Sequence, residues 1–180
     1  MAELAKPVKC ERGSEMGLSE DQERVALQER ELKLPGLDAR FAWELGVRMR
    51  TLAEERGQSV VIDVQRFGQP LFYCALEGTT PDHPEWVRRK SNVVARFHRS
   101  SYAIGFKMRS KKETLEAHQG LPLVDYATDG GSFPLAVVGA GVVGSATVSG
   151  LPERFDHELV VEALCALLGR DYEALKLAAE

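Results

Sequence analysis

The residues best suited to chemistry gather in one stretch of the chain, residues 88–112. This stretch holds nine of the 23 basic residues and no Asp or Glu. The rest of the chain carries 14 basic and 27 acidic residues, a net charge of −13, although the whole chain has a net charge of −4. Such a local excess of positive charge attracts small anions or an acidic partner. The alternative interpretation is that the basic residues form a solvated helix face and bind no ligand. The surrounding negative charge argues against indiscriminate binding of nucleic acid.

Two residues of this stretch interrupt the pattern of an amphipathic helix. On a helical projection of residues 86–105, Lys90 lies inside the apolar face and His98 lies at its margin. Arg89 and Arg96 border the same face, where their stems can cover apolar surface. A lysine in this position must snorkel to solvent, pair with a carboxylate or contact an anionic ligand. Three roles are open for His98. It can be a hydrogen-bonded residue at the margin of the apolar face, an axial ligand to haem iron, or a proton-transfer group.

A further possibility is an enzyme that uses His98 as a general acid or base, because Ser100, Ser101 and Tyr102 follow it closely. No complete catalytic triad is visible. The four histidines show neither H-x-x-x-H nor H-x-x-E-H spacing, so the sequence offers no metal set either. Whether the chain is an enzyme is therefore left undecided by the sequence.

Residues 139–144 read GAGVVG and match the G-x-G-x-x-G spacing of dinucleotide-binding loops. That motif requires a helix directly after the glycines, but the next residues, SATVSGLP, are poor helix formers. We expect a β-hairpin instead, with strands at 133–138 and 142–150, and no bound nucleotide.

The remaining elements follow from hydrophobic periodicity and from turn residues. The pattern predicts one hairpin with strands at 59–67 and 71–76, and helices at 18–34, 38–57, 86–112 and 152–169. Ser19 and Asp38 are the predicted N-caps of the first two helices, and Phe155 is assigned to the apolar stripe of the last. Two hairpins that join into one antiparallel sheet, with helices packed on it, give an α+β fold. We expect a flexible N-terminal arm at 1–17 and a single domain at 18–180.

Composition places this chain among soluble globular proteins. Of its 180 residues, 44% are hydrophobic and 28% are charged, and no apolar run is long enough to cross a bilayer. The first residues lack the apolar segment of a secretory signal, so we expect a cytoplasmic protein without membrane association. The three cysteines are far apart and odd in number, which argues against a disulfide framework.

Several motifs together resemble a known family. The run R-K-S-N-V-V after a hairpin, then GG-SFPL, then VVGSATVSG, is similar in content and order to the haem-degrading (GlcG/HbpS-like) domain family, and in particular to its uncharacterised cytoplasmic branch. The resemblance spans about residues 20–170. It implies a profilin-like sheet carrying helices, assembled into a symmetric homo-oligomer.

The resemblance also implies a ligand. We expect an oligomeric binding protein that accepts an anionic ligand such as haem, with His98 as the ligand to haem iron and with a ligand-binding set of Arg89, Lys90, Arg96, His98 and Tyr102. The main alternative is an oligomeric adaptor or chaperone-associated protein that binds an acidic protein partner. The lesser alternative is the small-molecule enzyme that uses His98.

Overall fold

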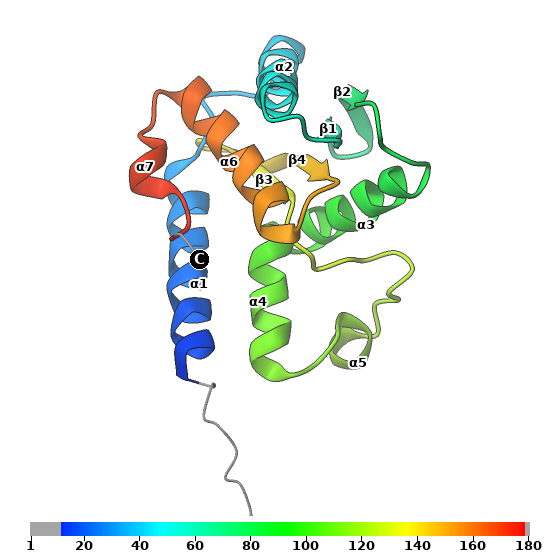
Figure 1. The fold of residues 1–180 in the computed structure, drawn as a ribbon, viewed down its shortest axis with the longest axis vertical. Helices are drawn as coiled ribbons and strands as arrows, with labels where there is room; N and C mark the ends of the chain where they lie inside the picture. The colour runs from blue at the N-terminus through cyan, green and yellow to red at the C-terminus, as the bar shows by residue number, and fades with distance from the viewer. Residues whose placement is uncertain (1–11, 179–180) are drawn as a thin grey trace, which may run out of the picture.

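The computed structural model describes residues 12–178 of the chain (Figure 1). Its elements, in chain order, are α1 (Arg12–Glu31), α2 (Ala39–Glu55), β1 (Val61–Arg66), β2 (Gln69–Ala75), α3 (Asp82–Phe97), α4 (Ser101–Lys111), α5 (Leu115–Gln119), β3 (Ser132–Val137), β4 (Gly141–Ser149), α6 (Glu153–Leu168) and α7 (Tyr172–Leu175). None of the helices in this part of the chain is both long and apolar enough to span a membrane.

The four strands form one antiparallel sheet in the order β2-β1-β4-β3. Both predicted hairpins are present, and the α+β fold expected from the sequence is confirmed. The GAGVVG segment turns the chain between β3 and β4, where Gly139 and Gly141 both adopt a φ of +80°. These left-handed conformations favour glycine, so the motif forms a turn and no helix follows it.

The two faces of the sheet differ in chemistry. Alternate residues of β1, including Ile62 and Val64, join side chains from α2 and α6 in the main apolar core. The opposite face, where α3 packs, buries polar side chains, among them Asp63 and Thr147. Thr147 forms a hydrogen bond of 2.8 Å with Ser132 on β3, which satisfies both hydroxyls away from water.

Helix boundaries near the N-terminus differ from the expectation. Helix α1 begins at Arg12, so residues 12–17 are helical, and Ser19 lies inside the helix where we expected its N-cap. Residues 1–11 of the expected arm lie outside the described part of the chain. Asp38 caps α2 as predicted, accepting a hydrogen bond of 2.7 Å from the Phe41 amide.

The basic stretch is two helices and not the single helix that we expected. Helix α3 ends at Phe97, and His98 follows with a φ of +53°, a left-handed conformation that terminates the helix. Helix α4 then starts with Ser100 as its N-cap and runs in a new direction (Figure 1). The residues after His98 therefore do not continue the face that carries Lys90.

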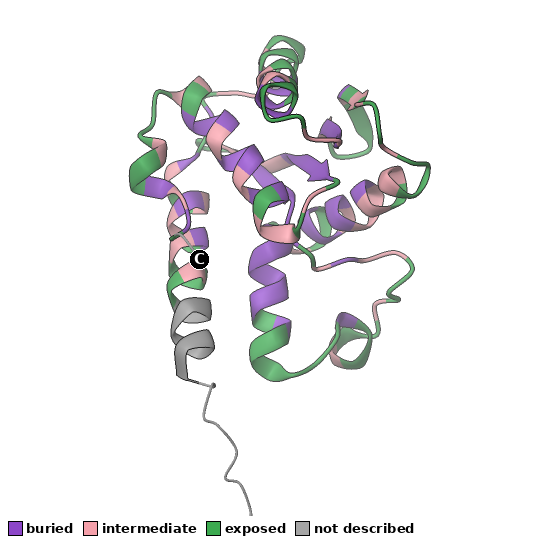
Figure 2. Ribbon diagram, in the orientation of Figure 1, coloured by how far each residue is buried: buried purple, intermediate pink, exposed green. Residues whose placement is uncertain are grey.

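Two residues of α6 were placed on the wrong side of the helix by the sequence pattern. Phe155 is exposed, although we assigned it to the core stripe. His157, whose acidic neighbours Asp156 and Glu158 indicate a surface position, is completely buried and lies near the rings of Tyr102 and Phe133. Helix α4 packs against α6, and Gln28 of α1 is hydrogen-bonded to the His157 ring at 2.8 Å, so the buried face of α6 is wider than one stripe (Figures 1 and 2).

Candidate functional site

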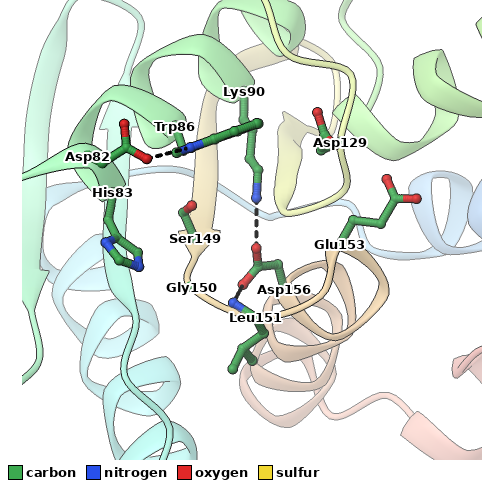
Figure 3. Close-up of a pocket in the computed structure, with 10 residues that line it drawn as sticks. All are labelled: Asp82, His83, Trp86, Lys90, Asp129, Ser149, Gly150, Leu151, Glu153 and Asp156. Carbon is green, nitrogen blue, oxygen red and sulfur yellow. Dashed lines mark hydrogen bonds and ion pairs between the residues drawn. The ribbon is translucent and has the colours of Figure 1, made fainter. Parts of the chain in front are cut away.

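A pocket opens where the start of α3 meets the turn between β4 and α6 (Figure 3). Its volume is about 240 Å³. We call it the Lys90 pocket, and the residues that line it are Asp82, His83, Trp86, Lys90, Asp129, Ser149, Gly150, Leu151, Glu153 and Asp156.

The deepest polar feature of the pocket is an ion pair between Lys90 and Asp156. The Lys90 Nζ lies 2.7 Å from Oδ2 of Asp156, and only 3% of Lys90 is exposed. The same ammonium lies 3.4 Å from the carbonyl oxygen of Val148. Of the three roles that the sequence left open for Lys90, pairing with a carboxylate is therefore realised.

Asp156 joins three elements at one point. Its Oδ1 accepts a hydrogen bond of 2.9 Å from the Leu151 amide, in the turn before α6, while its Oδ2 meets Lys90 from α3. Burial raises the pKa of Asp156 to about 6, and the nearby Lys90 ammonium opposes that rise without cancelling it. The pair thus fixes α3 to the turn between β4 and α6.

On one side of the Lys90–Asp156 pair, the backbone of residue 131 can lie close to Val148 and Lys90 because this residue is a glycine. A Cβ at Gly131 would lie 2.4 Å from the Val148 carbonyl oxygen and 2.9 Å from Lys90 Nζ. Its φ of +130° is also one that residues with a side chain rarely adopt. Asp129-Gly130-Gly131 is a strong turn signal in the sequence, and the structure shows that Gly131 also makes room for the lysine.

The rim of the pocket is acidic. The carboxylate of Asp82 accepts a hydrogen bond of 2.9 Å from the Trp86 indole, and Glu153 accepts one of 3.0 Å from the Gly130 amide. Glu153 also pairs with Arg109 at 3.3 Å. Asp129 forms no ion pair within the described residues and lies on the rim (Figure 3).

The hydroxyl of Ser149 supplies a further polar group within the pocket. Ser149 is only 4% exposed, and its side chain forms no hydrogen bond with any residue of the described chain. His83 lies across the mouth in the first turn of α3, where its Nδ1 contacts Thr80 at 3.0 Å. The residues around it, TTPDHPEW, indicate an exposed loop in the sequence, but His83 is half-buried in a helix.

The five residues predicted to bind a ligand do not share one pocket. Only Lys90 lines the Lys90 pocket. Arg89 lies over the Trp86 ring, 4.6 Å from its centroid, and donates to a loop carbonyl oxygen. Arg96 is exposed, His98 is exposed at the end of α3, and Tyr102 is buried on α4 against Phe106.

Several charges of the basic stretch are neutralised within the chain. Arg88 pairs with Glu85 and with Asp125, at 2.9 and 3.0 Å. Arg99 pairs with Glu29 on α1, and Arg109 pairs with Glu153 as described above. The stretch therefore looks more basic in the sequence than it is in the folded chain, because its acidic partners come from distant segments.

The hydroxyls close to His98 serve backbone structure. The Ser100 hydroxyl accepts from the Ala103 amide as an N-cap, and the Ser101 hydroxyl accepts from the Ser132 amide at 3.1 Å. The His98 ring instead stacks on Phe67, with centroids 5.8 Å apart. No hydroxyl is hydrogen-bonded to His98 within residues 12–178, as a nucleophile would need to be.

Within one copy of the chain, the residues that we predicted to bind haem do not lie together. The proposed iron ligand, His98, stacks on Phe67 at the surface, while Lys90 and Tyr102 lie in separate environments. The Lys90 pocket, at about 240 Å³, is smaller than the roughly 300–1,000 Å³ of sites for drug-sized ligands. Haem exceeds most such ligands in size, so the Lys90 pocket is too small to hold it. Among the described residues, no cluster of three or more His, Cys, Asp or Glu side chains is arranged to hold a metal ion.

No feature of the sequence marks Asp156 as a site residue. Lys90 and Asp156 lie 66 residues apart, on different helices. Asp156 stands beside Phe155 and His157 in a first helical turn, where an acidic residue is usually explained by the helix dipole. The one available signal was Lys90 itself, which required a partner of opposite charge.

Comparison with known proteins identifies relatives along most of the chain. The family model described as "Haem degrading protein HbpS-like" matches residues 37–165. A UPF0303 protein of Acidobacterium capsulatum is 60% identical over 162 residues, which cover 90% of this chain and 98% of that protein. A UPF0303 protein of Burkholderia thailandensis is 58% identical over 163 residues, covering 91% and 99%.

Solved structures share the fold. The crystal structure of Ybr137w protein matches with a TM-score of 0.76 and 26% identity, over 86% of this chain and 90% of that one. The structure of a PduOC:heme complex matches with a TM-score of 0.61 and 17% identity, over 73% and 94%. At that identity the second likeness concerns the fold alone. Since the family model covers more than half of the sequence and the relatives match nearly all of it, the chain belongs to the HbpS-like haem-degrading family.

Proposed function

We propose that this chain is a cytoplasmic ligand-binding protein and that its ligand occupies the Lys90 pocket. The observation that supports this best is the buried Lys90–Asp156 pair, which lines an open pocket together with the Ser149 hydroxyl. A pocket with a few convergent polar groups is the usual form of a small-molecule site. The volume of about 240 Å³ suits a small organic molecule.

The charge of the lining favours a cationic ligand. Lys90 is already paired with Asp156, so the remaining charged groups of the lining are the carboxylates of Asp82, Asp129 and Glu153. The ion pair with Arg109 neutralises the charge of one of these carboxylates, that of Glu153. A small ammonium group could approach Asp129 without displacing an existing ion pair, whereas a carboxylate ligand would meet net negative charge.

Putrescine and succinate test this assignment because they have similar length and opposite charge. In isothermal titrations of the whole chain we expect saturable binding of putrescine and none of succinate. Asp129→Asn should weaken putrescine binding about fivefold to tenfold, the loss of about one charge interaction. Asp125→Asn, four residues away and outside the pocket lining, is the matched control. Binding of succinate but not putrescine, or of neither at millimolar concentration, would contradict the proposal.

Haem binding is the second proposal, and the family match supports it. It requires a site other than the Lys90 pocket, and His98 remains the proposed iron ligand. Titration of the chain with hemin, followed by absorbance, should give a saturable Soret band. Loss of that band in His98→Ala, with retention in His118→Ala, would support the assignment. An unchanged band in His98→Ala would exclude His98 as the ligand.

A further inference from the structure

Another hollow of the surface lies where α2 and α6 pack against each other (Figure 1). Its volume is about 540 Å³, and it shares no lining residue with the Lys90 pocket. We call it the Arg48 groove, and the residues that line it are Trp43, Glu44, Val47, Arg48, Thr51, Ala166 and Leu167.

The groove follows from the spacing of residues along α2. Trp43, Val47 and Thr51 recur every four residues, so they form a single row on the surface of the helix. The last turn of α6, at residues 166–167, supplies an opposing apolar wall. Packing of the two helices therefore leaves an apolar channel at the surface between this row and the end of α6.

A large apolar side chain of the groove is both exposed and held in place. Trp43 is 62% exposed, and its ring meets Phe72 of β2 edge to face, with centroids 5.7 Å apart. Phe72 comes close to α2 because residue 46 is a glycine, at which a Cβ would lie 2.2 Å from the Phe72 ring. An indole that is already positioned offers apolar contact area at little cost in conformational entropy, as binding sites require.

The guanidinium of Arg48 has no counter-ion within the described part of the chain. Its Nε is buried there and forms no hydrogen bond. Two neighbouring arginines of α2 differ from it. Arg40 pairs with Glu44 at 2.9 Å, and Arg50 pairs with Glu54 at 2.9 Å. Because Arg40 neutralises the one carboxylate of the lining, the groove keeps one uncompensated positive charge beside its apolar surface.

We propose that the Arg48 groove binds a small carboxylic acid with an apolar tail, such as a medium-chain fatty acid. The carboxylate pairs with the Arg48 guanidinium, and the tail covers the exposed indole of Trp43 and the side chain of Leu167. The Thr51 hydroxyl, in the same lining, is a further donor for the carboxylate.

The size and the charge of the groove both support this ligand class. Its volume of about 540 Å³ falls within the roughly 300–1,000 Å³ of small-molecule sites. One unpaired cation next to apolar side chains complements a ligand with a single negative charge at the end of an apolar chain. The inference does not depend on the ligand of the Lys90 pocket, because the two linings are separate.

Octanoate and octanamide test the role of charge, since they have the same chain length and only octanoate is charged. In isothermal titrations of the full chain we expect saturable binding of octanoate, with a dissociation constant on the order of 100 µM. Octanamide should bind about tenfold more weakly or not at all. Equal affinity for the two compounds, or no binding of octanoate at millimolar concentration, would overturn the proposal.

Three variants locate the contacts. Arg48→Gln, which removes the charge, and Trp43→Ala, which removes the indole, should each weaken octanoate binding about tenfold. Arg50→Gln is the matched control, because Arg50 lies on the same helix, outside the lining and paired with Glu54. Unchanged affinity in a folded Arg48→Gln, or an equal loss in Arg50→Gln, would contradict the proposal. If Arg48→Gln does not fold, Trp43→Ala and the octanamide comparison decide.

Tryptophan fluorescence separates this groove from the Lys90 pocket. The chain has two tryptophans, so Trp86→Phe leaves Trp43 as the only one. Octanoate should shift the emission of this variant to shorter wavelength, because the tail shields the Trp43 ring from water. Emission that stays unchanged at saturation, or loss of octanoate binding in Trp86→Phe, would place the ligand elsewhere and overturn the assignment.

Discussion

Lys90 Nζ and Asp156 Oδ2 lie 2.7 Å apart, and both side chains are almost completely withdrawn from solvent. Burying two charges is costly, and their attraction offsets that cost only when the geometry is good. Here Asp156 also accepts the Leu151 amide, so both of its oxygens are satisfied. The pair therefore holds α3 to the turn before α6 and also forms the buried polar part of the lining of the Lys90 pocket.

Removing one partner of this pair should cost more than removing both charges. Lys90→Met leaves Asp156 buried beside an apolar side chain, and we expect the free energy of unfolding to fall by about 3 kcal/mol at pH 8. Lys90→Met/Asp156→Asn should recover at least half of that loss, because the amide oxygen can still accept from Leu151. Urea denaturation measures both values. A double variant less stable than Lys90→Met would argue against an uncompensated charge as the cause.

Gly131 should tolerate no side chain. Gly131→Ala places a Cβ against the Val148 carbonyl oxygen and Lys90 Nζ, at a φ of +130°, and we expect a loss of about 2–4 kcal/mol. Gly139→Ala separates the two causes, because Gly139 has a φ of +80° but no atom within 4 Å of the added Cβ. Backbone conformation alone should cost it about 1–2 kcal/mol. Equal losses in thermal or urea denaturation would mean that the close approach to Lys90 is unimportant.

Asp63 should make stability depend on pH. It is buried on the polar face of the sheet, forms no ion pair within residues 12–178, and burial raises its pKa to about 6. The folded state therefore holds this proton more tightly than the unfolded state does. Its contribution favours folding below about pH 4 and is lost as the pH rises through about 6.

Asp63→Asn should remove the loss of stability that accompanies ionisation of Asp63 as the pH rises. We expect the free energy of unfolding to rise by about 1–3 kcal/mol at pH 7.5 and to change little at pH 4. Asp129→Asn, at an exposed carboxylate that forms no ion pair within the described residues, should stay within about 0.5 kcal/mol of wild type at both pH values. Urea denaturation at the two pH values checks this. A gain of the same size at both would show that charge burial at Asp63 is not responsible.

The end of α4 offers a stabilising substitution. Lys112 follows α4 with a φ of +55°, a conformation in which glycine costs least. Lys112→Gly should raise stability by about 1 kcal/mol. Lys111→Gly, one residue earlier and still in the helix, should lower it by about 0.5 kcal/mol because glycine is a poor helix former. Thermal denaturation of the two variants should therefore shift the midpoint in opposite directions.

Local sequence determined much of this fold. Alternating apolar residues in β1 and the left-handed glycines of the β3–β4 turn gave both hairpins, and Asp38 fixed the start of α2. These features act over a few residues, so their spacing is readable in the chain itself. The break at His98 was missed because a histidine is not a usual helix terminator. Its left-handed conformation follows from the packing of α3 and α4 on different parts of the molecule.

The sequence by itself determined that Lys90 needs a partner, since an ammonium on an apolar helix face cannot remain alone. Only the tertiary structure decided that the partner is Asp156 and that Arg88, Arg99 and Arg109 are neutralised by acids elsewhere in the chain. The reason is physical: ion pairs and pockets depend on distances through space, and residues far apart in the sequence are brought together only when the elements pack.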